Sequence, residues 1–298
     1  MNYLYYPGCS LEGTAKEYDI STRALMQAVG ADLVDIEDWS CCGASAAEST
    51  SYLLSLALPA RNLALAEKMD QEGDILVPCS ACYLNLQKVA QKVAEDKGLL
   101  QNINLVLGEE DLTLHGTTKV RHLLDVLAND VGAKTIAAKV KKPLSGLQVA
   151  PYYGCQALRP YALFDDPEAP QSMEPLIAAT GASVWPWEMD ATCCGANHMN
   201  TKPEVAMSLV ADILRAAKGA DAIVTVCPMC QMNLDAFQKK ISRKSDEDLS
   251  ISVLYLPQLL GSALGLSDDQ VRLDLNFSFG LDFNHREAVA NQMLMPEA

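Results

Sequence analysis

The sequence predicts an α/β protein of two similar domains related by internal duplication, and three observations support this prediction. Cysteine motifs occur in the same order in both halves of the 298-residue chain. Short apolar segments alternate with amphipathic helical patterns, as in sheets covered by helices. A basic segment with a proline and a glycine, KVKKPLSGL at 139–147, interrupts the pattern between the halves. The predicted domains therefore span 1–146 and 147–298.

The individual elements follow from composition and periodicity. Buried strands are predicted where segments of five to seven residues are largely apolar and rich in Val, Ile or Tyr, namely at 2–6, 31–37, 74–78, 147–153, 182–187 and 222–226. Helices are predicted where apolar residues recur at a helical period, namely at 21–29, 58–70, 83–96 and 202–218. The tail at 267–298 lies outside the repeat, where it could dock onto a partner or close a substrate crevice.

Cysteine content and charge limit the classes of function. The N-terminus resembles no signal peptide and no apolar run is long enough to cross a membrane, so we expect a cytoplasmic protein without membrane insertion. In a reducing cytosol, ten cysteines indicate metal or redox chemistry rather than disulfides. A formal net charge of -15 argues against binding to nucleic acid or anionic membranes, which leaves proteins and small molecules as partners.

Each half carries a single cysteine, a cysteine pair and a CxxC motif, in that order. The first set comprises Cys9, Cys41, Cys42, Cys79 and Cys82. The second set comprises Cys155, Cys193, Cys194, Cys227 and Cys230. The single cysteines and the CxxC motifs directly follow predicted strands, so all five thiols of a set are expected at the carboxyl end of one sheet.

This spacing favours a polynuclear metal centre. For a lone CxxC at the start of a helix, a thioredoxin-like dithiol or half a zinc site would be as good an explanation as part of a larger metal centre. Zinc and ordinary cubane clusters each take four ligands, whereas each set here has five, two of them adjacent. Gly43 and Gly195, directly after the pairs, are expected to let the backbone turn and donate N–H groups to sulfur.

The complete pattern resembles the doubled cysteine-rich CCG domain of the heterodisulfide reductase B subunit over nearly the whole chain. The resemblance implies two Rossmann-like domains, each holding one noncubane [4Fe–4S] cluster through its five cysteines, with the clusters at the domain interface and a small disulfide between them. It also implies two partners: a ferredoxin-like C subunit with two cubane [4Fe–4S] clusters and a flavin-containing A subunit. The segment CCGASAAES is similar to bacterial homologues, which argues against specificity for coenzymes M and B.

Two hypotheses about function follow. The first is a catalytic subunit that cleaves or forms a disulfide, with Cys41 and Cys193 as catalytic ligands. His198, four residues after Cys194, is either a proton donor in this reaction or an exposed loop residue. The second is an electron-relay subunit of a larger redox complex. Two structural zinc sites are a third, weaker alternative. His122, aligned here with Gln258, is expected to be a buried hydrogen-bonding residue rather than a ligand.

Overall fold

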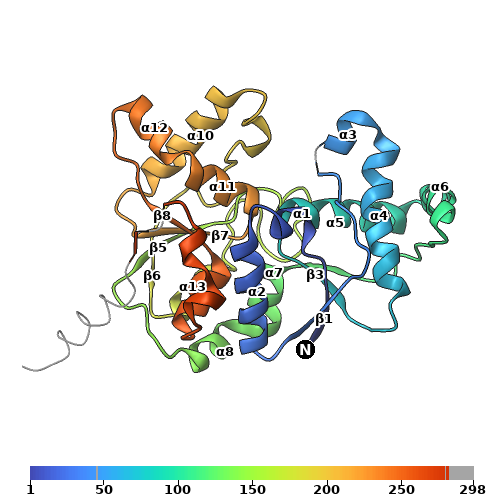
Figure 1. Cartoon of the computed structure of the whole chain (residues 1–298), viewed down its shortest axis with the longest axis horizontal. Coiled ribbons are helices and arrows are strands. Elements are labelled where there is room, and N and C mark those ends of the chain that lie inside the picture. Colours follow the sequence, from blue (N-terminus) through green and yellow to red (C-terminus); the bar gives the residue numbers. More distant parts are fainter. Residues whose placement is uncertain (45, 279, 282–298) are drawn as a thin grey trace, which may run out of the picture.

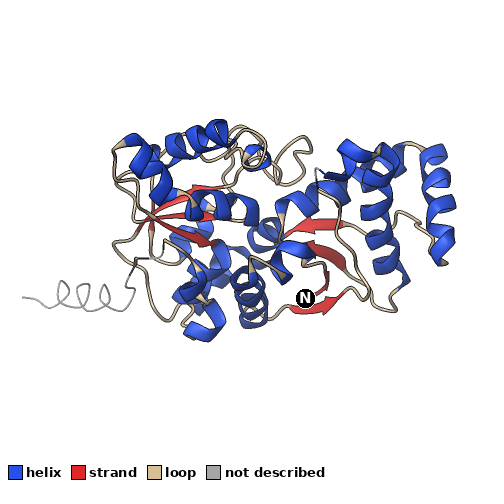
Figure 2. Ribbon diagram, turned by 45° about the horizontal axis from the view of Figure 1, so that its top comes forward, coloured by secondary structure: helices blue, strands red, loops and turns tan. Residues whose placement is uncertain are grey.

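The computed structural model contains two four-stranded parallel sheets, one from each half of the chain (Figures 1 and 2). It describes residues 1–44, 46–278, 280 and 281. The strands of the first sheet have the order β2-β1-β3-β4, and those of the second have the corresponding order β6-β5-β7-β8. The prediction of two similar α/β domains is therefore confirmed.

The first sheet is formed by β1 (Asn2–Tyr5), β2 (Asp32–Asp35), β3 (Asp74–Val77) and β4 (Val120–His122). Its helices are α1 (Gly8–Glu12), α2 (Lys16–Ala28), α3 (Ala46–Thr50), α4 (Tyr52–Lys68), α5 (Ser80–Glu95), α6 (Lys97–Leu107), α7 (Leu123–Asp125) and α8 (Gly132–Lys139). A π-helical segment, Val126–Val131, joins α7 to α8. The α4 helix begins six residues before the predicted segment, because Ser51 caps it by accepting a hydrogen bond from the backbone N–H of Leu54.

The second sheet is formed by β5 (Gln148–Tyr152), β6 (Ser183–Val184), β7 (Ala222–Thr225) and β8 (Ser252–Tyr255). Its helices are α9 (Glu174–Ala179), α10 (Pro203–Ala216), α11 (Pro228–Ala236), α12 (Gln238–Ser245), α13 (Leu256–Ala263) and α14 (Asp268–Val271). Pro151 stands inside β5, but beyond the two residues of β5 that pair with β6, so its missing N–H breaks no ladder bond with that strand.

The two domains are joined through buried helices. The α2 helix of the first domain packs against α13 of the second, where the rings of Tyr18 and Tyr255 stack with centroids 4.0 Å apart. Both tyrosines are fully buried. One apolar cluster accordingly extends across the interface, from Tyr18 to Leu256 and Leu260.

The first part of the tail packs against its own domain. The side-chain amide of Gln258 donates to Asn276 Oδ1 at 2.8 Å, and the backbone N–H of Phe277 donates to Asp235 at 2.8 Å. Residues 282–298, for which partner docking or crevice closure was considered, lie outside the described residues. No helix in the described part of the chain has the length and apolar character needed to cross a membrane.

Candidate functional site

Both CxxC motifs lie at helix N-termini, directly after the central strands of the two sheets. Cys79 precedes α5 and Cys227 precedes α11, each in extended conformation. The first turn of a helix has N–H groups without backbone partners, which favours negative charge on nearby sulfur. All four CxxC thiols are buried, with 2 to 5% of their surface exposed. These cysteines are therefore fixed by regular structure.

Two glycines bring the single-cysteine loops against the CxxC motifs. Gly8 and Gly154, which precede Cys9 and Cys155, have φ values of +74° and +69°. A Cβ at Gly8 would lie 2.8 Å from Cys82 Sγ, and a Cβ at Gly154 would lie 2.9 Å from the Sγ of Cys230. Only glycine tolerates both the conformation and the close approach of the sulfur.

The thiols of the first set form a continuous chain of contacts. Cys9 Sγ lies 3.6 Å from Cys41 Sγ, and Cys42 Sγ lies 3.4 Å from Cys82 Sγ. The remaining contacts join Cys41 to Cys42 and Cys79 to Cys82. The structure thus brings all five predicted residues of this set together.

The second set repeats this arrangement. Cys194 Sγ lies 3.5 Å from Cys230 Sγ, Cys230 also contacts Cys227, and Cys155 contacts Cys193. Gly195, at φ +71°, donates its N–H to Cys193 Sγ at 3.3 Å, as Gly43, at φ +73°, donates to Cys41 Sγ at 3.5 Å. Both glycines act on sulfur in the way that the sequence predicts.

Each set has a buried part and a surface part. Cys42 and Cys194, the second members of the pairs, are buried like the CxxC thiols. Cys9, Cys41 and Cys193 are exposed, whereas Cys155 is half-buried. The first cysteine of each pair is therefore open to a partner molecule.

Hydrogen bonding gives the thiols within each set different acidities. The pKa of Cys42 is lowered to about 3, because the thiols of Cys41 and Cys82 and the amide of Asn85 stabilise its thiolate. The pKa of Cys193 is lowered to about 5 by hydrogen bonds from Cys155 and from the N–H of Gly195. Hydrogen bonding to these thiolates, together with burial, raises the pKa of the neighbouring thiols Cys41, Cys82 and Cys155. Each set thus contains at least one thiol that is readily deprotonated for metal binding.

The sequence interpretation missed two pairs of supporting residues. Tyr6 Oη donates to the carbonyl of Ser40 at 2.7 Å, and Tyr152 Oη donates to the carbonyl of Thr192 at 2.6 Å. Each bond holds the residue that precedes a cysteine pair. The repeat could have identified both tyrosines, because YYPGC and YYGC each have a tyrosine two residues before the glycine.

The second missed pair consists of Asn85 and Asn233. The amide of Asn85 donates to the carbonyl of Cys42 at 3.4 Å and approaches its Sγ at 3.6 Å, and that of Asn233 donates to the carbonyl of Cys194 at 3.1 Å. The amides thereby tie each cysteine pair to the helix that follows the CxxC motif. Both asparagines stand three residues after the second CxxC cysteine, in CYLNL and CQMNL.

The two sets approach each other across the domain interface. Tyr18 Oη lies 3.1 Å from the carbonyl oxygens of both Pro78 and Val226, which precede Cys79 and Cys227. The hydroxyl of Ser80, beside Cys79, lies 3.3 Å from the Val226 carbonyl. The buried ends of the two sets are thus linked directly.

His122 lies close to this junction, and its alignment with Gln258 was wrong. His122 pairs with Val77 in the sheet, two residues before Cys79, whereas Tyr255 pairs with Thr225, two residues before Cys227. The residue equivalent to His122 is therefore Tyr255. The error arose because apolar residues of the two halves were aligned without knowledge of the strand register. The connections between the CxxC motif and the last strand differ in the two halves, so this alignment was displaced.

His122 is a buried, neutral hydrogen-bonding residue. Its Nδ1 accepts a hydrogen bond from the N–H of Leu124 at 3.1 Å, and its Nε2 lies 3.2 Å from Ser80 Oγ. Burial lowers the pKa of His122 to about 4. Its ring is stacked on Phe164, which comes from the second domain.

The second set opens onto a surface cavity of about 450 Å³. Cys155 and Cys193 line it together with Arg159 and carboxylates that include Asp190. The guanidinium of Arg159 is held by the carbonyl of Ala191 and by Glu168 at 3.4 Å. His198 is exposed near this set, and its charge, like that of Arg159, favours the Cys193 thiolate.

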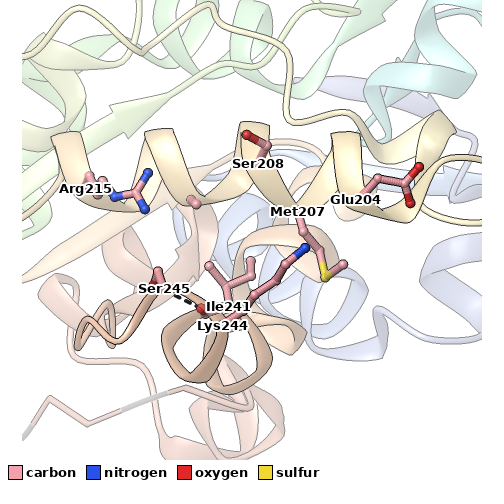
Figure 3. Close-up of a pocket in the computed structure, with 8 residues that line it drawn as sticks. Glu204, Met207, Ser208, Arg215, Ile241, Lys244 and Ser245 are labelled. Atoms are coloured by element: carbon pink, nitrogen blue, oxygen red, sulfur yellow. Dashed lines mark hydrogen bonds between the residues drawn. The ribbon is translucent and has the colours of Figure 1, made fainter.

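A further hollow, of about 270 Å³, lies between α10 and α12 (Figure 3). Met207 and Ile241 line it with apolar side chains, and the side chain of Lys244 extends toward Met207, while Arg215 lines it farther along α10. Arg215 is paired with Asp212 at 3.0 Å and with Glu247 at 3.2 Å. No cysteine lines this hollow, so it is separate from the candidate site.

The donor sets fit a centre that contains several metal atoms. Two thiolates on one tetrahedral ion, at about 2.3 Å each, would lie about 3.8 Å apart. The measured pairs at 3.4 to 3.6 Å are close to that spacing. Among the described residues, however, no three His, Cys, Asp or Glu side chains are placed to hold a single metal ion. Five thiols without carboxylate or imidazole ligands are the donor chemistry of iron–sulfur clusters.

Comparison with known proteins supports this interpretation. The model of the CCG cysteine-rich domain matches twice, at residues 3–87 and 149–235. The chain is 38% identical over 278 residues to the 8-methylmenaquinol:fumarate reductase membrane anchor subunit of Wolinella succinogenes, covering 92% of this chain and 96% of that protein. It is 31% identical over 287 residues to the B subunit of the ferredoxin/F(420)H(2)-dependent CoB-CoM heterodisulfide reductase of Methanosarcina acetivorans, covering 93% and 94%.

A solved structure shows the same fold. A hypothetical protein from Helicobacter pylori superimposes with a TM-score of 0.76 and 15% sequence identity, covering 94% of this chain and 52% of the other. With the doubled domain match and relatives of 38% and 31% identity over more than 90% of their length, the chain belongs to the family of doubled CCG cysteine-rich domain proteins that includes the heterodisulfide reductase B subunit.

Proposed function

We propose that this chain is the subunit of an iron–sulfur reductase complex in which a disulfide is reduced between two noncubane [4Fe–4S] clusters, one in each five-cysteine set. The observation that carries the proposal is the approach of the two sets, where Ser80 and Tyr18 link the residues beside Cys79 and Cys227. Reduction of a disulfide takes two electrons and two protons and releases two thiols. When bound, each cluster supplies one electron, so that two clusters meet this requirement.

The residues of the chain divide the remaining tasks. The buried cysteines and the N–H groups of Gly43 and Gly195 hold the two centres. The exposed first members of the pairs, Cys41 and Cys193, face the substrate side. Arg159, in the cavity beside Cys193, binds an anionic group of the substrate. His198 returns one of the two protons to a departing thiolate, and solvent at the open cavity supplies the other.

Electrons reach this chain from other proteins of the complex. Relatives are named as B subunits of heterodisulfide reductases, which supports partner subunits in one complex. The resemblance to that family implies that these are a ferredoxin-like C subunit with two cubane clusters and a flavin-containing A subunit. We propose a cytoplasmic location for this complex.

A second candidate is an electron relay in a quinol-linked reductase. It is favoured by the 38% identity to the fumarate reductase subunit of W. succinogenes, which exceeds the 31% identity to the heterodisulfide reductase relative of M. acetivorans. In that case the clusters pass electrons onward and no disulfide is bound.

The experiment uses the anaerobically purified native complex with reduced methyl viologen as the electron donor. Thiol release from a panel of small disulfides is measured beside oxidation of a menaquinol analogue. We expect thiol release that is abolished in Cys41→Ser and Cys193→Ser. Menaquinol oxidation without release of any thiol would replace the proposal by the relay.

A further inference from the structure

A surface cavity of about 240 Å³ lies where the two domains meet. The loop between α1 and α2 and the start of α2 line one side, and α11 and the tail line the other. The lining includes Lys16, Glu17, Gln231, Met232, Leu275 and Phe277. At its edges, the N–H of Gly13 donates to the carbonyl of Cys9 at 3.1 Å, and the N–H of Gln231 donates to the carbonyl of Cys227 at 3.0 Å. A molecule seated here therefore lies one helical turn from a cysteine of each set.

Glu17 places a negative charge inside this cavity. It is the second residue of α2, and 5% of its surface is exposed. Its backbone carbonyl accepts a hydrogen bond from Ser21, but in the described part of the chain no other residue forms a hydrogen bond or ion pair with its carboxylate. Burial raises the pKa of Glu17, and the charge of Asp235 raises it further. A buried carboxylate needs a cation or a hydrogen-bond donor, so we expect a ligand of this cavity to bring a positive charge.

Two cations of this region leave Glu17 unpaired. Arg272 is held by Asp274, with their nitrogen and oxygen 2.9 Å apart. Lys16, the other charged residue of the lining, is exposed and forms no ion pair with Glu17 in the structure as described for residues 1–44 and 46–278. The carboxylate of Glu17 is therefore available to a cation from another molecule.

Three apolar residues of the lining are exposed to an unusual degree. Met232, Leu275 and Phe277 have 38, 39 and 76% of their surface exposed. The backbone beneath the Phe277 ring is nevertheless fixed, because the N–H groups of Phe277 and Ser278 donate to the Asp235 carboxylate at 2.8 and 2.7 Å. Phe and Met side chains at fixed, exposed positions are typical of surfaces that bind another protein, where Arg is also enriched. The apolar lining thus indicates a protein ligand.

We propose that this cavity receives an Arg or Lys side chain of the electron-donating subunit, whose cation pairs with Glu17 while apolar residues beside it cover Leu275 and Phe277. The inference rests on the proposed function, which requires such a subunit. The formal net charge of -15 favours a partner with a basic surface. Docking at this place brings the partner to both cysteine sets at the domain interface. Glu17 and Phe277 are docking residues in this scheme and take no part in the chemistry at the clusters.

The first test is photo-cross-linking in the native complex. Phe277 is replaced by the photoreactive residue p-benzoylphenylalanine, and Leu105, which is 74% exposed on α6, is replaced in the same way as the control. We expect position 277 to cross-link to a peptide of the electron-donating subunit that contains Arg or Lys, and position 105 not to react with that peptide. A cross-link from position 277 to no subunit, or to a peptide without Arg or Lys, overturns the proposal.

The second test measures the dissociation constant between the cluster-loaded chain and the electron-donating subunit that is purified with it. Glu17→Gln removes the charge at nearly constant size, and we expect it to raise the dissociation constant at least about tenfold. Glu12→Gln, at an exposed carboxylate of α1, is the matched control and should leave the constant unchanged. Equal constants in the two variants overturn the ion pair. If Glu17→Gln does not fold, Phe277→Ala decides, because its exposed ring is expected to contribute to binding, and unchanged binding refutes the docking site.

Further outcomes separate this inference from the proposed function. Thiol release driven by reduced methyl viologen needs no partner, so Glu17→Gln should retain it, and its loss would overturn the docking role of Glu17. A native complex that releases no thiol from any disulfide overturns the proposed function, whereas the dissociation constants still decide the docking site. Butylguanidinium serves as a free cation of the same chemistry. If it raises the melting temperature of the native chain but not of Glu17→Gln, and position 277 cross-links to no subunit, the cavity binds a small cation and the docking proposal fails.

Discussion

The replacement Gly8→Ala is expected to remove the iron–sulfur centre of the first set alone. Gly8 has a φ of +74°, a conformation that costs an L-residue about 1–2 kcal/mol. The added Cβ would lie 2.8 Å from Cys82 Sγ, well inside an ordinary contact distance of about 3.5–4.0 Å. Cys82 is buried, its Sγ lies 3.4 Å from Cys42 Sγ, and the same added Cβ would lie 3.6 Å from the Tyr6 ring. One of the five thiols must therefore leave its position.

Gly30→Ala is the matched control for backbone strain. Gly30 has a φ of +83°, and a Cβ there would meet no atom within 4 Å. Both variants thus carry the same cost of a left-handed residue, about 1–2 kcal/mol, and only Gly8→Ala crowds a sulfur. The difference between them isolates the contact between the glycine loop and the CxxC motif.

The assay is iron and acid-labile sulfide per chain, together with paramagnetic resonance of each centre. Gly30→Ala is expected to keep both centres, whereas Gly8→Ala loses half of the iron and retains the signal of the second set. Equal iron contents in the two variants would refute the inference that Gly8 and Cys82 belong to one site.

Three further predictions concern the residues around the cysteines. Tyr18→Phe keeps the ring but removes the donor that lies 3.1 Å from the buried carbonyls of Pro78 and Val226, so it should lower the free energy of unfolding by about 1–3 kcal/mol. Tyr52→Phe, at an exposed ring, should change it by less than about 0.5 kcal/mol, and equal effects in denaturant titrations would contradict this. Asn85→Ala should increase the rate at which a chelator removes iron from the first centre, because the hydrogen bond from the Asn85 amide to the Cys42 carbonyl is lost. The rate at the second centre should not change, and equal rates at both centres would count against this prediction. Since the pKa of His122 is about 4 in the fold and about 6.5 when unfolded, stability should fall by about 1.4 kcal/mol per pH unit as pH drops from 6.5 to 4. In unfolding measurements at several pH values, the free energy of unfolding of His122→Asn should fall less steeply between pH 6.5 and 4 than that of the native protein. The same pH dependence in both proteins would disprove this prediction.

Much of the fold was predictable because it is encoded twice. Each half repeats strand, cysteine loop, strand, cysteine pair, strand and CxxC, and a buried parallel strand has a distinct apolar composition. Gly43 and Gly195 were also predictable, since a turn directly after a cysteine pair directs N–H groups at sulfur. The domain boundary near 146 and the ligand role of each cysteine remain predictions.

Contacts between the halves were not predictable from the pattern. Tyr18 lies before the helix predicted at 21–29, and only the packing of α2 on α13 places its hydroxyl between two carbonyls of different domains. The alignment of His122 failed for a related reason. Helices α5 and α6 are longer than α11 and α12, so spacing along the chain does not locate the last strand.

The central claim is that two iron–sulfur centres meet at the domain interface and bind substrate sulfur. The most direct measurement is paramagnetic resonance of the oxidised, anaerobically purified protein during titration with small thiols. We predict a new signal that depends on the thiol and is lost in Cys193→Ser, where the exposed cysteine beside the cavity is replaced. Two intact clusters whose spectra respond to no thiol would contradict the claim.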